Sequence, residues 1–184
     1  MLHNLVAAFI GFLTLLYPIA VYFGIQYLEP WKIGLILLGL LLLRVVLVKS
    51  DKKHSQLLML IGIAFCILAV WSNNLITLRF YPVLISFCLF VIFASSLFYP
   101  PPVIERLARL QHPDLPEQGV RYTRKVTQVW CVFFVCNGLI ATVTAVWSSL
   151  AWWSLYNGFI SYILMALLMV VEYLVRIRTQ DHVR

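Results

Sequence analysis

The side chains best suited to binding chemistry are the cations of one polar segment, Tyr99–Lys125. These cations are Arg106, Arg109, Arg121, Arg124 and Lys125. Guanidinium and ammonium groups bind phosphates and carboxylates, and each adds about 1 kcal/mol of attraction near an anionic leaflet. The segment is therefore a candidate for binding a lipid phosphate or the acidic surface of a partner protein. In the alternative interpretation, these residues only set the membrane topology and extend toward the headgroups.

Glu172 is the one acidic residue expected inside a helix bundle. It lies four residues before Arg176, and this spacing predicts an ion pair along one helix face. In the alternative interpretation, Glu172 faces the interior of the bundle, pairs with Arg44 and controls the passage of protons or of a lipid.

Asn137 lies in the middle of another apolar stretch and is followed by Gly138. An amide can hydrogen-bond to a neighbouring helix where a glycine lets two backbones approach closely. The pair therefore predicts a helix–helix contact, with a substrate contact as the alternative.

No group of residues has the pattern of a catalytic or metal site. The four histidines do not occur with Cys, Asp or Glu at ligand spacing, and no two of the four cysteines have C-x-x-C spacing. The chain also lacks G-x-S-x-G, H-E-x-x-H and a glycine-rich phosphate loop. The sequence thus predicts no catalytic residue, cofactor or metal, and a protein that is not an enzyme.

The composition indicates which elements carry these residues. Hydrophobic residues make up 62% of the 184 residues and charged residues only 11%, whereas a soluble domain carries about 25% charged residues. Lipid is the solvent that accepts such an excess, and backbone in lipid must be helical. We expect one all-α membrane domain over residues 1–184, a bundle of about six transmembrane helices. The expected spans are 5–27, 31–48, 57–71, 80–99, 126–147 and 153–175.

A short amphipathic helix is expected between the fourth and fifth spans. Three prolines end the fourth span, and the apolar residues that follow recur at helical spacing. These apolar residues are Val103, Ile104, Leu107 and Leu110. The charged residues Glu105, Arg106 and Arg109 are expected away from this stripe, so that the helix lies in the membrane interface. A polar loop over residues 112–119 should follow.

The basic residues favour six spans over an odd number. With six spans, all 14 lysines and arginines except Lys32 and Arg79 fall on one side of the membrane. The positive-inside rule then places both termini in the cytoplasm. The net charge of +7 is explained by topology and lipid headgroups, and nucleic acid is not expected as a partner.

Several short runs resemble the inner-membrane intracellular septation protein A family, also called YciB/IspZ-like. These runs are Arg79–Pro82, Pro102–Leu107, Trp130, Phe133–Phe134 and Gly138. The resemblance is strongest over residues 79–145 and extends more weakly over the chain. Asn137 and Ala141 depart from the family pattern, which suggests a branch of the kind encoded beside lipid or aryl polyene synthesis enzymes.

The resemblance implies a bacterial inner-membrane protein with a role in envelope integrity and no catalytic activity. Its partners would be membrane lipids and envelope or lipid-synthesis proteins, for which it would act as a scaffold. The main alternative is a lipid or polyene-lipid transporter, or a subunit of one. Six helices are few for such a carrier, so this alternative would require a homo-oligomer. A membrane enzyme is the third hypothesis, and it lacks the clustered His, Asp and Glu residues that it needs.

Overall fold

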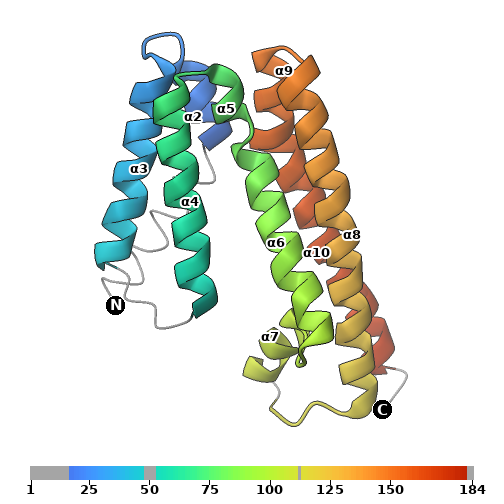
Figure 1. Cartoon of the computed structure of the whole chain (residues 1–184). Helices are drawn as coiled ribbons and strands as arrows, with labels where there is room; N and C mark the ends of the chain where they lie inside the picture. Colours follow the sequence, from blue (N-terminus) through green and yellow to red (C-terminus); the bar gives the residue numbers. More distant parts are fainter. Residues whose placement is uncertain (1–16, 48–52, 112, 182–184) are drawn as a thin grey trace. The chain divides into compact units, whose positions relative to one another are not determined.

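The computed structural model describes residues 17–47, 53–111 and 113–181 (Figure 1). Within these ranges the regular structure is helical and contains no strand. The prediction of an all-α chain is confirmed, although valine, isoleucine and phenylalanine otherwise favour strands. Helices satisfy every backbone group within one segment, which suits a chain this apolar.

Three helical stretches are long and apolar enough to cross a membrane. They are Leu75–Phe98, Glu117–Trp147 and Leu150–Ile177, and Pro30–Leu43 and Met59–Ser72 are shorter apolar helices. Each stretch contains a strongly apolar window of 18 residues. The protein buries at most 28% of the residues in any of these three windows. Lipid is the medium that can cover such exposed apolar surface. The prediction of an α-helical membrane protein is therefore confirmed in its general form.

The described helices group into two compact units. The first unit comprises Met1–Pro82 and Ala141–Ile160, and the second comprises Val83–Ile140 and Ser161–Arg184. Helices at the borders of these ranges contribute residues to both.

The first unit contains α2 to α5, the end of α8, α9 and the π-helix η1. The bounds are α2 Tyr17–Gly24, α3 Pro30–Leu47, α4 Lys53–Ser72, α5 Leu75–Arg79, α9 Leu150–Leu155 and η1 Tyr156–Ile160. Helices α3 and α4 pack closely, because a Cβ on Gly34 would lie only 3.0 Å from Cγ2 of Val70. The core of the unit gathers around Leu78 and Trp153, both fully buried.

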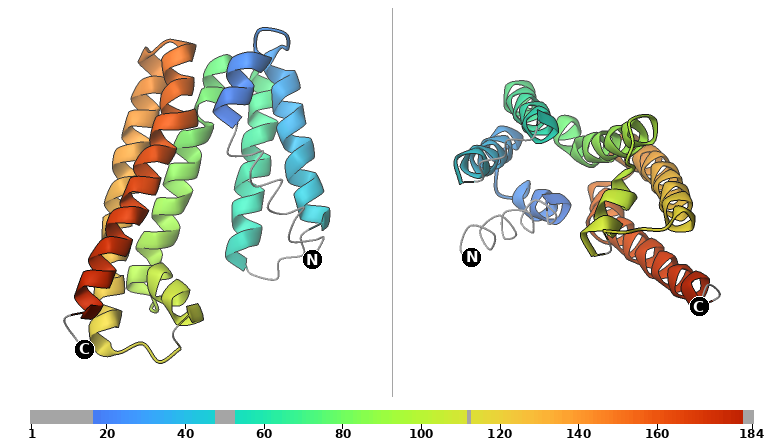
Figure 2. Two further views of the ribbon diagram at one scale, coloured as in Figure 1. Left: turned by 180° about the vertical axis from the view of Figure 1, so that it is seen from behind. Right: turned by 90° about the horizontal axis from the view of Figure 1, so that it is seen from below.

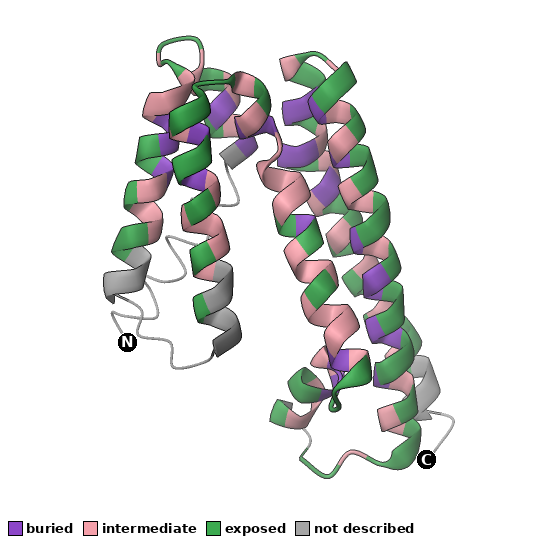
Figure 3. Ribbon diagram, viewed as in Figure 1, coloured by how far each residue is buried: buried purple, intermediate pink, exposed green. Residues whose placement is uncertain are grey.

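The second unit contains α6 Tyr81–Phe98, α7 Val103–Gln111, α8 Glu117–Trp147 and α10 Ser161–Asp181. Figures 1 and 2 show α10 lying beside α8 along its length. The core of the unit is aromatic, with ring centroids 5.1 Å apart for Phe93 and Phe134 and 5.6 Å apart for Trp130 and Phe134. In Figure 3 the buried positions of α8 recur along the helix between exposed ones, as expected for a helix that packs on one side only.

Two sequence predictions about the polar segment after α6 need correction. Helix α8 begins at Glu117, so the loop covers only Pro113–Pro116 of the expected 112–119. The predicted start of the fifth span at residue 126 lies within this helix and stays a prediction. Hydropathy marks where a chain becomes apolar, whereas a helix continues through polar residues that suit it. His112 lies outside the described residues.

The orientation of α7 also differs from the prediction. Leu107 and Leu110, expected to face the same way as Ile104, are 55% and 80% exposed, while Ile104 packs against the Trp130 core. Glu105, expected on the polar side, is only 5% exposed. Its carboxylate can face inward because a guanidinium neutralises it there, as described below.

Candidate functional site

The candidate site is the basic connector, which we define as residues 103–125: helix α7, the loop Pro113–Pro116 and the first turns of α8. Its start is fixed to α6, because the Val103 N–H donates a hydrogen bond of 3.1 Å to Oγ of the buried Ser96. The connector contains all five predicted cations, and the structure assigns them different roles.

Arg106 is used locally. Its Nε donates a hydrogen bond of 2.7 Å to the carbonyl oxygen of Pro101, and its Nη2 lies 3.5 Å from the carbonyl oxygen of Tyr99. These carbonyls belong to the turn between α6 and α7, where helix geometry leaves acceptors unpaired. Arg106 therefore closes this turn.

Arg109 joins the two ends of the connector. Its guanidinium forms an ion pair with Glu105, with Nε and Nη2 each 2.8 Å from Oε1. Its Nη1 donates a further hydrogen bond of 3.0 Å to the carbonyl oxygen of Pro113. One side chain thus neutralises a buried carboxylate and attaches the loop to α7.

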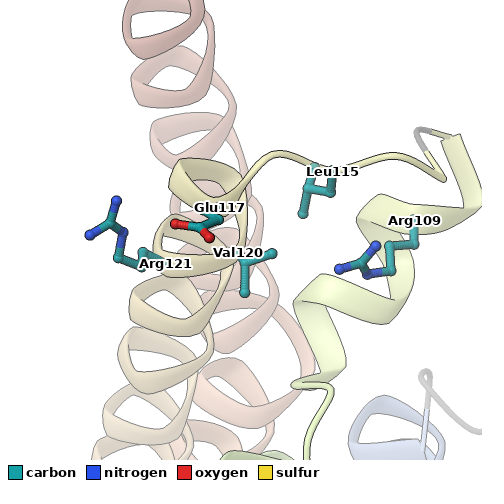
Figure 4. Close-up of a pocket in the computed structure, with 5 residues that line it drawn as sticks. All are labelled: Arg109, Leu115, Glu117, Val120 and Arg121. Carbon is teal, nitrogen blue, oxygen red and sulfur yellow. The ribbon is translucent and has the colours of Figure 1, made fainter.

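Beside Arg109 lies an open pocket of about 410 Å³, lined by Arg109, Leu115, Glu117, Val120 and Arg121. In Figure 4, Arg109 extends from α7 toward α8, while Arg121 lies on the far side of Val120 with its guanidinium turned outward. The pocket therefore combines two cations, one carboxylate and an apolar floor.

Arg121, Arg124 and Lys125 are exposed on the first turns of α8. Within the described ranges, their side chains form no hydrogen bond or ion pair. These three cations are free to attract an anionic surface, whereas Arg106 and Arg109 also hold parts of the connector together.

Glu172 is half-buried in α10 and lies next to Tyr122 of α8, whose hydroxyl donates a hydrogen bond of 3.1 Å to the Glu172 backbone carbonyl. Arg176 instead lies over the ring of Tyr173, with Cζ 5.6 Å from the centroid. In this described part of α10 no ion pair joins Glu172 to Arg176, contrary to the spacing argument. The side chain of Arg44 lies outside the described residues, so its predicted pairing with Glu172 stays a prediction.

Asn137 and Gly138 form the helix–helix contact that their types predict. Nδ2 of Asn137 donates a hydrogen bond of 3.1 Å to Oγ of Ser86 on α6. A Cβ on Gly138 would lie 3.3 Å from Cβ of the same serine. The glycine therefore lets α6 and α8 approach closely enough for the hydrogen bond between Asn137 and Ser86 to form.

Arg79 was not predicted as a site residue; it entered the sequence analysis as one of two cations on the outer side and as the start of a run that resembles the septation protein A family. Arg79 is 9% exposed and donates hydrogen bonds of 2.6 Å from Nη2 to the carbonyl oxygens of Thr144 and Ser148. Its Cζ lies 6.0 Å from the ring centroid of Trp153, and its Nε is buried without a partner. An isolated arginine at the edge of an apolar stretch, against the positive-inside trend, was the signal that could have identified it.

Comparison of the chain with protein-family models, with curated proteins and with solved structures found no match. The resemblance to the septation protein A family therefore stays a prediction. Within the described residues, no group of three His, Cys, Asp or Glu side chains is placed to hold a metal ion.

Proposed function

We propose that this chain is a bacterial inner-membrane protein that acts as a scaffold for envelope or lipid-synthesis machinery and is not an enzyme. In this proposal it crosses the membrane six times, with both termini in the cytoplasm. The observation that carries it is the set of three free, exposed cations on the first turns of α8, Arg121, Arg124 and Lys125. The resemblance to the septation protein A family supports the same role.

The length of α8 supports the placement of these cations outside the hydrocarbon. Its 31 residues rise about 46 Å at 1.5 Å per residue, whereas the hydrocarbon core is about 30 Å thick. About ten residues must therefore extend beyond the core. The apolar part of α8 lies toward Trp147, so the excess is the charged start of the helix. Its cations would stand among the headgroups or just beyond them, within reach of an acidic partner.

The orientation of α7 supports an interfacial position for this helix. Leu107 and Leu110 are exposed, and so are the aromatic residues Phe98 and Tyr99 at the end of α6. Aromatic side chains and the apolar face of an amphipathic helix both favour the boundary between headgroups and acyl chains. In the proposed arrangement, the two leucines insert there and hold the connector at the membrane surface.

The test is affinity purification of the tagged full-length protein from its native membranes in mild detergent, followed by mass spectrometry of the co-purified proteins. The variant carries Arg121→Gln, Arg124→Gln and Lys125→Gln. The matched control carries Arg121→Lys and Arg124→Lys, which keep the charge and hence the topology. We expect specific envelope or lipid-synthesis proteins with the natural chain and the control, and their loss with the glutamine variant. Equal recovery of the same proteins with the glutamine variant would contradict the proposal.

A further inference from the structure

The pocket beside α7 holds charges of both signs, which a general anion-binding surface does not need. Arg109 forms the wall on the α7 side, while Glu117 and Arg121 lie on α8. Leu115 and Val120 supply apolar surface between them. The volume of about 410 Å³ falls in the usual range of small-ligand pockets, about 300–1,000 Å³.

Arg109 is held in place and still has donors to spare. A guanidinium has five N–H groups, and Arg109 directs three of them at Glu105 and the Pro113 carbonyl. Two N–H groups therefore remain for a ligand. Because the side chain is already ordered by these bonds, a bound phosphate would not have to restrict its rotamers.

Glu117 and Arg121 are four residues apart on one helix, a spacing that favours an ion pair. No such pair forms, and in the described part of the chain neither side chain has another ion pair or hydrogen bond. Figure 4 shows the Arg121 guanidinium at the rim, turned outward. An exposed arginine changes rotamer within nanoseconds, so both charges are available to a ligand that carries the opposite ones.

From this arrangement we propose that the pocket binds a phospholipid headgroup that carries both a phosphate and a primary ammonium. The phosphate accepts hydrogen bonds from Arg109 and Arg121, and the ammonium donates to the carboxylate of Glu117. The glycerol end of the lipid lies against Leu115 and Val120. This inference rests on the proposed position of the connector at the membrane surface.

The chemistry distinguishes this headgroup from other common ones. A glycerol headgroup has no cation for Glu117, so its hydroxyl groups can offer the carboxylate only uncharged donors, whose hydrogen bonds are weaker than those of an ammonium. A choline headgroup has a cation without N–H groups, which cannot hydrogen-bond to the carboxylate. Glu117 is thus the residue that determines specificity, and Arg121 strengthens the binding of any phosphate.

The test uses the full-length protein in detergent and native mass spectrometry. Phospholipids with identical acyl chains and ethanolamine, choline or glycerol headgroups are added in equal amounts. We expect the natural chain to retain the ethanolamine lipid preferentially. Glu117→Gln should reduce its preference over the glycerol lipid about tenfold, which corresponds to one charge-assisted hydrogen bond. Arg121→Gln should lower the retention of all three lipids.

The matched control is Arg124→Gln, which removes an equally exposed cation of α8 that does not line the pocket. We expect it to leave the preference and the retention close to those of the natural chain. An unchanged preference in Glu117→Gln, or equal losses in Arg121→Gln and Arg124→Gln, would overturn the inference. Both of those results are compatible with the scaffold function, whose own test is the recovery of partner proteins.

Discussion

Arg79 donates two hydrogen bonds from Nη2 to Ser148, one of 2.6 Å to its carbonyl oxygen and one of 3.3 Å to its hydroxyl. Ser148 directly follows the last residue of α8, Trp147. The last carbonyls of a helix have no partner within the helix and carry its negative dipole end. A buried guanidinium there donates hydrogen bonds to these carbonyls and places a positive charge at the negative end of the dipole. Arg79 is therefore stabilised without any carboxylate.

We expect Arg79→Gln to destabilise the protein, because a neutral amide cannot replace charge-assisted hydrogen bonds to two carbonyls. Hydrogen bonds to charged groups contribute about 1.5–3 kcal/mol, so the thermal midpoint in detergent should fall by several degrees. Arg124→Gln is the control, because Arg124 is exposed. Equal thermal midpoints for the two variants would show that Arg79 does not stabilise the end of α8.

Gly138→Leu should push α6 and α8 apart. A Cβ at this position would already lie 3.3 Å from Cβ of Ser86, and a larger side chain needs more room. Overpacking of this kind costs about 1–3 kcal/mol, measurable as a lower midpoint of unfolding in detergent. Gly39→Leu is a matched control within another apolar helix, since a Cβ there would meet nothing within 4 Å. If both leucines were tolerated equally, close approach at Gly138 would not be required.

Arg109→Ala should loosen α7 more than Glu105→Gln does. The alanine variant leaves the carboxylate of Glu105 buried without its cation, which costs more than the roughly 1–3 kcal/mol of an unsatisfied neutral group. The glutamine variant removes the buried charge and keeps an acceptor for Arg109. Hydrogen exchange of the α7 amides should therefore increase strongly in the first variant and weakly in the second. The reverse order would contradict the role assigned to this ion pair.

Leu107→Ser combined with Leu110→Ser should release α7 from a bilayer without unfolding the protein, because both side chains are exposed. We expect faster proteolysis of the connector in liposomes and an unchanged thermal midpoint in detergent. Ile104→Ser serves as the comparison: it should lower the midpoint, since Ile104 packs against the Trp130 core. Unchanged proteolysis of the double variant in liposomes would argue against an interfacial α7.

The sequence by itself determined the helical class and the membrane environment, because both follow from composition and from the length of apolar stretches. It also predicted the contact of Asn137 and Gly138, since a mid-helix amide beside a glycine has few other uses in lipid. These features depend on neighbours along the chain or on the solvent.

Only the tertiary structure decided which cations are free and which are used. Arg79 and its acceptor Thr144 are 65 residues apart in the sequence, so no local pattern relates them. The inward position of Glu105 depends on how α7 is rotated, and the hydrogen bond of Val103 to Ser96 and the packing of Ile104 on Trp130 set this rotation. A helical pattern defines which residues share a face, whereas the partners available in three dimensions decide which face turns inward.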